Sequence, residues 1–469
     1  MKKLVYTSLL ALMLAGMACT ANFEEINTNL NQPLAVTGDL LLPTVIFDLA
    51  DFSVNQSFGL GDIISQYYAH YEFNDLDIYR WTSDGSFWAL YDYLQNIRDI
   101  KQYGVENELA GYEAVALILE AYAFSQLTDA YGDVPYSQAN QAEAGIIAPA
   151  YDAQETIYDG IIASLERANT LIDGDASVAG DILFGGNMNA WKKFANTLRV
   201  RLLMRISDVR DVSASLQQIV GDPITYPLFA STGDDAIYRY AGASPNLSPY
   251  SQGRGREYEY FLAMPTTRFI GLLQAHEDPR IHEWLGYKGG TTEYIGVQPG
   301  LNLGDIGRPT AYASKDSSFF YEPAKIAAIF ITYSELNFLL AEAAERDLIT
   351  GDAQSYYEAG VTASFAQWGV AMPTDFLTSK APYQAGNLDR LFEQKWLALY
   401  RTCTEAWFDW KRTGKPAFIQ AGPGNINGNQ VPVRLMYPSL EQSVNVANYS
   451  AASQRIGGDN INTRVWWDQ

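Results

Sequence analysis

Apolar residues recur at three- and four-residue intervals along much of the chain, and this spacing predicts amphipathic helices. We expect helices over residues 39–52, 60–71, 84–103, 108–131, 152–171, 191–207, 266–275, 331–345, 353–368 and 389–412. Ala353, Tyr357 and Gly360 have the small, aromatic, small spacing that lets paired helices pack closely in tetratricopeptide repeats. The pattern therefore predicts an all-α fold built from tetratricopeptide-like helical pairs.

Capping residues place the starts of two of these helices. Thr82 and Ser83 precede the 84–103 segment, and residues 152–155 form a box-like start to the 152–171 helix. Lys192, Lys193, Arg199, Arg201 and Arg205 lie among apolar positions of the 191–207 helix. We interpret this basic density as a face that is either solvated or paired with acids.

Between residues 222 and 321 the composition becomes rich in Gly, Pro, Ser, Asn and Tyr, and only 266–275 has a clear helical pattern. Long irregular segments inside a helical frame are commonly binding surfaces. We therefore expect a single domain over 39–469. It comprises a helical scaffold at 39–221 and 325–412, a loop-rich ligand region at about 222–324, and a C-terminal segment, 413–469, that wraps over the helices.

The N-terminus has the organisation of a secretory signal. A basic start at Lys2 and Lys3 precedes an apolar run over 4–15 and small residues at 16–18, immediately before Cys19. We expect 1–18 to be a lipoprotein signal peptide, Cys19 to carry lipid, and 19–38 to be a tether. The alternative is an ordinary signal peptide. The apolar run is shorter than the roughly 20 residues that span a bilayer.

Composition limits the classes of partner that the protein can bind. A formal charge of −22 argues against nucleic acid, whose phosphates require clustered Lys and Arg. Aromatic residues make up 13% of the chain, enough to supply flat surfaces for ligands as well as core. With Cys19 lipidated, Cys403 has no disulfide partner, and its place in a predicted apolar helix indicates an inert buried thiol.

Several segments, read together and in order, carry a resemblance to a known family. They are 22–33 (Asn-Phe-Glu-Glu-Ile-Asn-Thr-Asn-Leu-Asn-Gln-Pro), 131–136 (Tyr-Gly-Asp-Val-Pro-Tyr), 151–158, 191–199, 277–280, 333–343, 395–400 and 405–412 (Glu-Ala-Trp-Phe-Asp-Trp-Lys-Arg). The chain resembles the SusD/RagB family of outer-membrane nutrient-binding lipoproteins. The resemblance is strongest to the subgroup that opens with Glu-Ile-Asn-Thr-Asn and closes with Val-Trp-Trp-Asp.

This resemblance implies a function and partners. It implies a cell-surface, outer-membrane lipoprotein that captures a glycan or an oligopeptide and delivers it to a SusC-like, TonB-dependent transporter. It also implies that ligand residues lie on loops near the early helices and in the central insertion. On this chain those regions supply Asp75, Asp77, Tyr79, Arg80 and Trp81, then Tyr250, Arg254, Arg256, Tyr258 and Tyr260, and finally Trp284, Tyr287 and Tyr294.

The chemistry of these candidates suits sugars. A sugar ring presents C–H faces that stack on Trp or Tyr, and its hydroxyls form hydrogen bonds with Asp, Asn or Arg. Tyr79, Arg80 and Trp81, which follow two aspartates, supply both kinds of side chain. Peptides use the same kinds of surface, and the arginines equally suit carboxylates. The sequence therefore leaves the ligand open between glycan and oligopeptide.

Two other functions remain open at this stage. A surface glycoside hydrolase needs two carboxylates across a cleft, but no spacing selects such a pair, and adjacent acids such as Asp234 and Asp235 indicate solvated charge. His70, His276 and His282 have no metal-binding spacing, and we expect neither metal nor cofactor. The other alternative is a purely structural subunit of the transporter complex. We expect a binding protein rather than an enzyme.

Overall fold

Helices make up most of the regular structure, which confirms the predicted all-α class. The computed structural model describes residues 37–306 and 310–469. Within it, Gly38–Gln469 form one compact unit. The expectations for the signal segment, Cys19 and most of the 19–38 tether lie outside the described residues.

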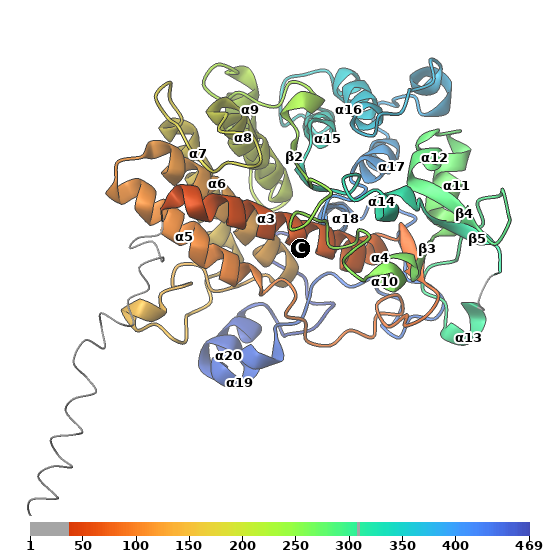
Figure 1. Cartoon of the computed structure of the whole chain (residues 1–469), viewed down its shortest axis with the longest axis horizontal. Coiled ribbons are helices and arrows are strands. Elements are labelled where there is room, and N and C mark those ends of the chain that lie inside the picture. The colour runs from red at the N-terminus through yellow and green to blue at the C-terminus, as the bar shows by residue number, and fades with distance from the viewer. Residues whose placement is uncertain (1–36, 307–309) are drawn as a thin grey trace, which may run out of the picture. The chain divides into compact units, whose positions relative to one another are not determined.

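The helices pack mainly on their neighbours in sequence (Figure 1). The first group is α3 (Gly38–Gln56), α5 (Leu90–Glu106), α6 (Ala110–Tyr131), α7 (Gln154–Leu171), α8 (Met188–Arg205) and α9 (Ser213–Gly221). The second group is α15 (Tyr333–Glu345), α16 (Ala353–Gln367), α17 (Leu388–Ala398) and α18 (Glu405–Thr413). Contacts run from α3 to α5, α6, α7 and α8 in turn, and α15 packs on α16, α17 and α8. Successive helical hairpins therefore form the scaffold.

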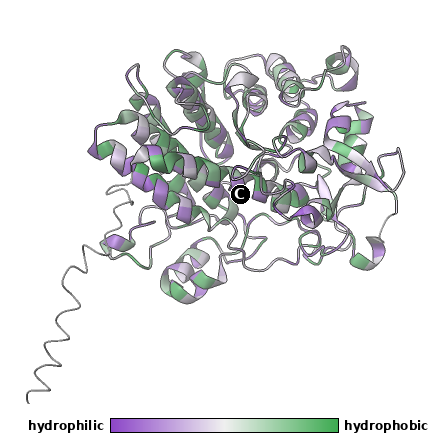
Figure 2. Cartoon of the chain, in the orientation of Figure 1, coloured by the Kyte–Doolittle hydropathy of each residue, from purple (hydrophilic) through white to green (hydrophobic). Residues whose placement is uncertain are grey.

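The core is centred on α6, which is buried along nearly its whole length and has apolar residues on all sides. Figure 2 shows this hydrophobic character continuing along α3, which packs with the same group of helices. In the second group, Gly360 allows α16 to approach α15 closely, because a Cβ there would lie 3.0 Å from the Phe338 ring. The Tyr357 ring packs edge-on to Phe338. The small, aromatic, small spacing read from the sequence thus serves helix pairing.

Short strands and short helices fill the segment between the two groups and the stretch between α3 and α5. β1 (Tyr68–His70) pairs with β3 (Ala263–Pro265), β2 (Ala236–Arg239) with β6 (Ala327–Ile331), and β4 (Leu285–Lys288) with β5 (Tyr312–Lys315), all antiparallel. Their companions are α4 (Asp62–Ile64), α10 (Glu257–Phe261), α11 (Thr267–Ala275), α12 (Arg280–Trp284), α13 (Leu303–Ile306) and α14 (Ser318–Tyr321). One-turn helices lie at Ser57–Gly61 (η1), Ala142–Ala144 (η2), Thr232–Asp234 (η3) and Phe376–Lys380 (η4). The sequence pattern did not predict these strand pairs.

The two helix starts that capping residues predicted were wrong. Helix α5 begins at Leu90 rather than at 84, because the Asp84 carboxylate accepts the backbone N–H of Ser86 and starts a turn instead. Helix α7 begins at Gln154 without a capping box. The carboxylate of Asp133 caps it from another segment by accepting the Gln154 N–H at 2.8 Å, while Asp152 accepts hydrogen bonds from Ser137.

Two predicted helices are interrupted. The 60–71 segment ends its helical turns at Ile64 and continues into β1. The 389–412 segment breaks between α17 and α18, where Arg401 and Cys403 have φ of +70° and +46°. Cys403 is buried, as expected, but it lies in this break rather than in a helix, and burial raises its pKa to about 12.

Four of the five basic residues of α8 are paired with acids, and the fifth, Lys192, donates to the Ile172 carbonyl. The three arginines are buried. Arg201 forms a two-point ion pair with Glu335 of α15, with Nε–Oε1 and Nη2–Oε2 distances of 2.5 and 2.6 Å. Arg205 bonds to Glu405 of α18 and lies 3.2 Å from Asp129 of α6. Of the two interpretations left open by the sequence, the structure supports the acid-paired face. These ion pairs join the two helical groups.

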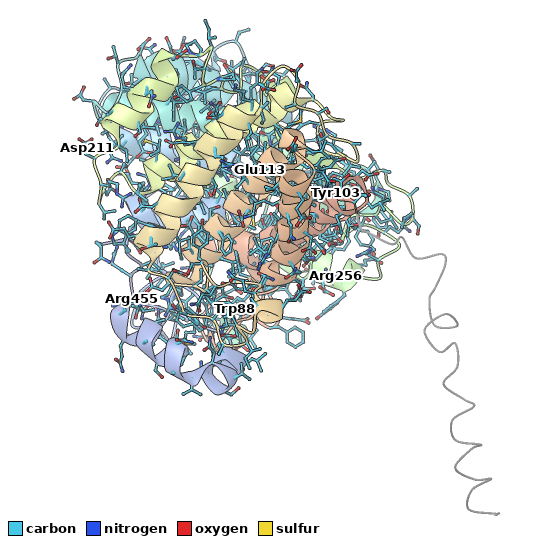
Figure 3. The ribbon with its side chains drawn as sticks, turned by 90° about the vertical axis from the view of Figure 1, so that its left-hand side faces the viewer. Trp88, Tyr103, Glu113, Asp211, Arg256 and Arg455 are labelled. Atoms are coloured by element: carbon cyan, nitrogen blue, oxygen red, sulfur yellow. The ribbon has the colours of Figure 1, made fainter. Side chains whose placement is uncertain are left out.

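The C-terminal segment lies against α6 and α7. Trp467 is buried and its Nε1 donates to Asp129 at 2.9 Å, while Arg434 donates to the Tyr131 carbonyl. Helices α19 (Ser439–Val444) and α20 (Val446–Arg455) follow the same side, and Figure 3 shows α20 at the lower end of the yellow helix α7. Arg455 of α20 donates to Asp133, the residue that caps α7.

We predict that Gly61→Ala destabilises the protein by about 1–3 kcal/mol, because an added Cβ would lie 2.2 Å from the Cys403 carbonyl oxygen and force the break between α17 and α18 to move. Gly59→Ala is the matched control, since nothing lies within 4 Å of its Cβ position. Urea unfolding measures both. Equal stability of the two variants would contradict the proposed close approach.

A second prediction concerns Glu342, which accepts both Nη groups of Arg412 at 2.6 and 2.7 Å. Burial alone would raise the pKa of Glu342, but Arg412 and Lys395 outweigh burial and lower this pKa to about 2. The pairing therefore stabilises the fold above pH 4.5, and this stabilisation is lost as pH falls towards 2. We expect Glu342→Gln to cost about 3 kcal/mol at pH 7 and progressively less below pH 4.5.

Urea unfolding of both proteins between pH 3 and pH 7 tests this expectation. Glu155→Gln is the control, because Glu155 pairs with Arg210 at the surface and its loss should cost under about 1 kcal/mol. A Glu342→Gln deficit that stays constant with pH would show that the carboxylate charge contributes nothing.

Candidate functional site

The predicted ligand loops meet around the short strands. β1 carries the loop 71–81 at its end, and its partner β3 follows α10, which ends the 250–260 loop. β3 also contacts β5, and β5 pairs with β4, on which Tyr287 lies. Three regions that are far apart in sequence are therefore joined through one set of strands.

Two hydrogen bonds link exposed tyrosines across this region. The Tyr258 hydroxyl donates to Glu72 at 2.8 Å, and the Tyr321 hydroxyl donates to Glu257 at 2.8 Å. Beside them lies an open hollow of about 550 Å³, lined by Gln252, Gly253, Gly255, Glu257, Tyr258 and Phe320. We call Phe73, Tyr258, Phe320 and Tyr321 the aromatic rim.

The rim exposes aromatic surface to solvent. Phe73 is 70% exposed, Tyr258 55% and Tyr321 47%. Sequence reasoning found Tyr258 but missed the other three rim residues. Phe73 directly precedes the loop segment selected at 74–81, and the run 319–321 lies inside the predicted ligand region, so aromatic density in loops was the available signal. Rings that remain exposed are the ones on which a ligand can stack.

Arginines flank the rim. Arg256 lies over the Tyr250 ring, 4.1 Å from its centroid, and donates to Asn55 at 2.7 Å and to Glu259. Burial would lower the pKa of Arg256, but Glu259 outweighs burial and raises it, so the side chain stays charged. Arg254 lies 3.7 Å from Asp51 and is more exposed. The region thus combines aromatic faces with fixed positive charge.

Other predicted residues face the interior. Tyr250 stacks on Phe58 with ring centroids 4.6 Å apart, and buried Tyr260 donates to the Asp316 carbonyl. Trp284 is completely buried in a second core cluster, stacked on Phe269. These rings hold the loops in place, and a role for them in ligand contact stays a prediction.

The 75–81 turn does not present its polar and aromatic residues on one face. Asp77 is buried and accepts the backbone N–H and Nδ1 of His70, both at 2.9 Å. Tyr79 is buried beside Gln66, and burial raises its pKa to about 12. Trp81 packs edge-on to Trp407, whereas Arg80 pairs at the surface with Asp75 at 3.0 Å.

A separate aromatic pair lies at the β4 strand. Tyr287 is 42% exposed, and its ring centroid is 4.6 Å from that of Tyr294. The Tyr294 hydroxyl is 2.8 Å from His282 Nδ1, which fixes this ring. The pair offers a second exposed aromatic surface near the rim.

The described residues give little support for other chemistry. Among residues 37–306 and 310–469, no three His, Cys, Asp or Glu side chains gather in a way that would hold a metal ion. Asp234 is paired with Lys193, and Asp235 accepts the Tyr333 backbone N–H while burial raises its pKa to about 7. Both acids therefore have structural partners. No helix in the described part of the chain has the length and apolar character to cross a bilayer.

Comparison with known families agrees with this arrangement. The SusD-like family described as "Starch-binding associating with outer membrane" matches residues 30–438. The chain belongs to this family. No protein among those with curated descriptions matches it.

Solved structures share the fold over nearly the whole chain. A SusD homologue from Bacteroides fragilis NCTC 9343 is 24% identical with a TM-score of 0.82, covering 92% of this chain and 100% of its own. An outer-membrane protein of Bacteroides vulgatus ATCC 8482, whose description points to nutrient binding, is 25% identical with a TM-score of 0.81 and the same coverage. A structure described as a chitin-binding protein is 26% identical with a TM-score of 0.80, covering 92% and 99%.

Proposed function

We propose that this protein is a cell-surface lipoprotein of the outer membrane that captures a glycan or an oligopeptide and delivers it to a SusC-like, TonB-dependent transporter. Cys19 would carry the lipid anchor. The observation that carries the proposal is the aromatic rim on a rigid helical scaffold. Tyr258 and the buried Phe320 line an open hollow there, and Phe73 and Tyr321 add exposed rings beside it.

The geometry of the rim favours binding of an extended ligand. Hydrogen bonds from Tyr258 to Glu72 and from Tyr321 to Glu257 fix ring positions before a ligand arrives, which lowers the entropic cost of stacking. The adjacent carboxylates and arginines offer acceptors and donors to hydroxyl or peptide groups. Because the hollow is open, several units of a chain can lie across it.

Among ligands, a glycan is the first class to test. The chitin-binding structure at 26% identity and the starch-binding description of the family both concern polysaccharides. The two glutamates at the rim, Glu72 and Glu257, accept hydrogen bonds from tyrosines, which is consistent with a surface that binds a glycan without cleaving it. Delivery to a transporter is the role that the family resemblance implies, and it gives a purpose to a binding surface held at the cell exterior.

We predict that the double variant Phe73→Ala, Tyr258→Ala weakens glycan binding by about 10- to 100-fold, because each stacked ring contributes roughly 0.7–1.4 kcal/mol. Both rings are exposed, so the melting temperature should change little. Calorimetric titration with chitin and starch oligosaccharides and with mixed oligopeptides measures the affinity. Tyr258→Phe is the matched control, since it keeps the ring and removes only the hydroxyl.

Unchanged affinity of the folded double variant for every ligand that the parent protein binds would contradict the role of the rim. Cleavage of a bound oligosaccharide by the purified protein would contradict a purely binding function.

We also predict that Cys19→Ser yields a folded protein that is released from the outer-membrane fraction, because the acyl chains that supply membrane affinity are no longer attached. Cell fractionation with metabolic fatty-acid labelling measures this, and Cys403→Ser serves as the control that retains the label. Persistent membrane association of Cys19→Ser would contradict the lipid anchor.

A further inference from the structure

A second hollow, of about 510 Å³, lies beside α18 and the C-terminal segment. Its lining comprises Trp410 of α18, then Gln430, Val431 and Val433, and finally Asn462 and Arg464. It shares no lining residue with the hollow at the aromatic rim. Its volume is within the roughly 300–1,000 Å³ that is typical of small-ligand sites. The hollow is therefore a separate candidate site.

Trp410 differs from the other tryptophans in its surroundings. All ten tryptophans lie within the described part of the chain. Each of the others has a contact with an aromatic ring or a cation, as Trp407 has with Trp81, but Trp410 has neither among the described residues. It is half-buried and packs on core residues. An indole that has no ring partner and lines a hollow is available for stacking.

Only the ring of Trp410 is offered to a ligand. Its Nε1 is buried, so a molecule in the hollow does not reach this donor. Hydrogen bonds in the site must therefore come from the other side chains of the lining.

Hydrogen bonds fix the walls of the hollow before a ligand arrives. Trp407, one turn earlier in α18, donates from Nε1 to the Pro432 carbonyl at 2.8 Å and holds the 430–433 segment against the helix. Asn427 and Asn462 exchange two side-chain hydrogen bonds, at 2.7 and 2.8 Å. These bonds join the two chain segments that form the walls. A ligand would not have to order them, which lowers the entropic cost of binding.

Two polar side chains of the lining are accessible and retain hydrogen-bonding capacity. Gln430 is exposed, and no described residue forms a hydrogen bond with its side-chain amide. The Arg464 side chain is 57% exposed, and its Nη1 donates to Asp468 at 2.6 Å. This pair balances the only charge on the lining. An amide both donates and accepts, as a sugar hydroxyl does, so the hollow suits a neutral ligand rich in hydroxyls.

We propose that this hollow is a second glycan-binding site, in which a neutral sugar unit stacks on Trp410 and its hydroxyls form hydrogen bonds with Gln430 and Arg464. The proposal rests on the proposed function only for the choice of a glycan as the ligand. A peptide fits less well, because its backbone lacks the flat C–H face that a pyranose ring presents to an indole. A polysaccharide long enough to reach both sites would be held more tightly than by either one alone.

Hydroxyl-radical footprinting of the full-length protein in detergent tests the proposal, with the oxidation of each tryptophan measured by mass spectrometry. Maltotriose and triacetylchitotriose are the sugar probes, and trialanine is the peptide probe. We expect at least one sugar to lower the oxidation of Trp410 at least twofold relative to that of Trp88, and trialanine to leave this ratio unchanged. Trp88 is also half-buried and lies outside both hollows, so the ratio corrects for radicals that the sugar consumes.

The double variant Phe73→Ala, Tyr258→Ala separates the two sites. Neither residue lines this hollow, so a sugar should protect Trp410 in the double variant as it does in the parent protein. The rim can therefore fail its own test while this site passes, and the reverse. Loss of Trp410 protection in the folded double variant would overturn the assignment of a separate site.

Gln430→Ala removes an exposed amide that has no protein partner, so the fold should tolerate it. The sugar concentration that gives half-protection of Trp410 should rise about 3- to 10-fold, the effect of one lost hydrogen bond. Gln454→Ala, exposed on α20 and outside the hollow, is the matched control and should behave as the parent does. Absence of protection by both sugars, equal protection by trialanine, or an unchanged half-protection concentration in Gln430→Ala would overturn the proposal.

Discussion

Buried cations of this protein need carboxylates, and that requirement connects the two groups of helices. An unpaired charge in the interior costs several kcal/mol, so each buried arginine specifies a partner. Arg201 pairs with Glu335, 134 residues later in the chain, and Arg205 pairs with Glu405, 200 residues later. Helix α8 is thereby held to α15 and α18, and the short strands and loops between them are fixed on a rigid frame. The aromatic rim depends on that frame.

The sequence predicted the helical class and most helices because apolar periodicity reports directly on packing, as in α6, α15 and α16. It failed where a distant segment decides the local structure. The continuous pattern over 389–412 gave no sign of the break at Arg401, which depends on close contact with Gly61. The start of α7 is likewise capped by Asp133 rather than by its own residues. The strand pairs are only three to five residues long, too short for alternation to stand out.

For the candidate site, the sequence predicted which loops are involved but not which of their side chains face solvent. Composition selected the 74–81 and 250–260 segments, and hydrogen bonds then decided which residues face solvent. Asp77 is buried in a hydrogen bond with His70. Tyr250 stacks on Phe58 and accepts a hydrogen bond from Arg256, whereas Tyr258 remains at the surface. Neither a motif nor a spacing distinguishes these outcomes, because they depend on contacts with residues far away in the chain.

The bond from Trp467 to Asp129 has a kinetic consequence. The two residues are 338 positions apart, and Asp129 belongs to the most deeply buried helix. During synthesis, α6 therefore emerges long before the tryptophan that completes its surroundings. Closing so large a loop is slow, and a high contact order delays folding. Until that late ring arrives, the early hairpins remain an incomplete intermediate with exposed apolar surface, the type of species that chaperones bind.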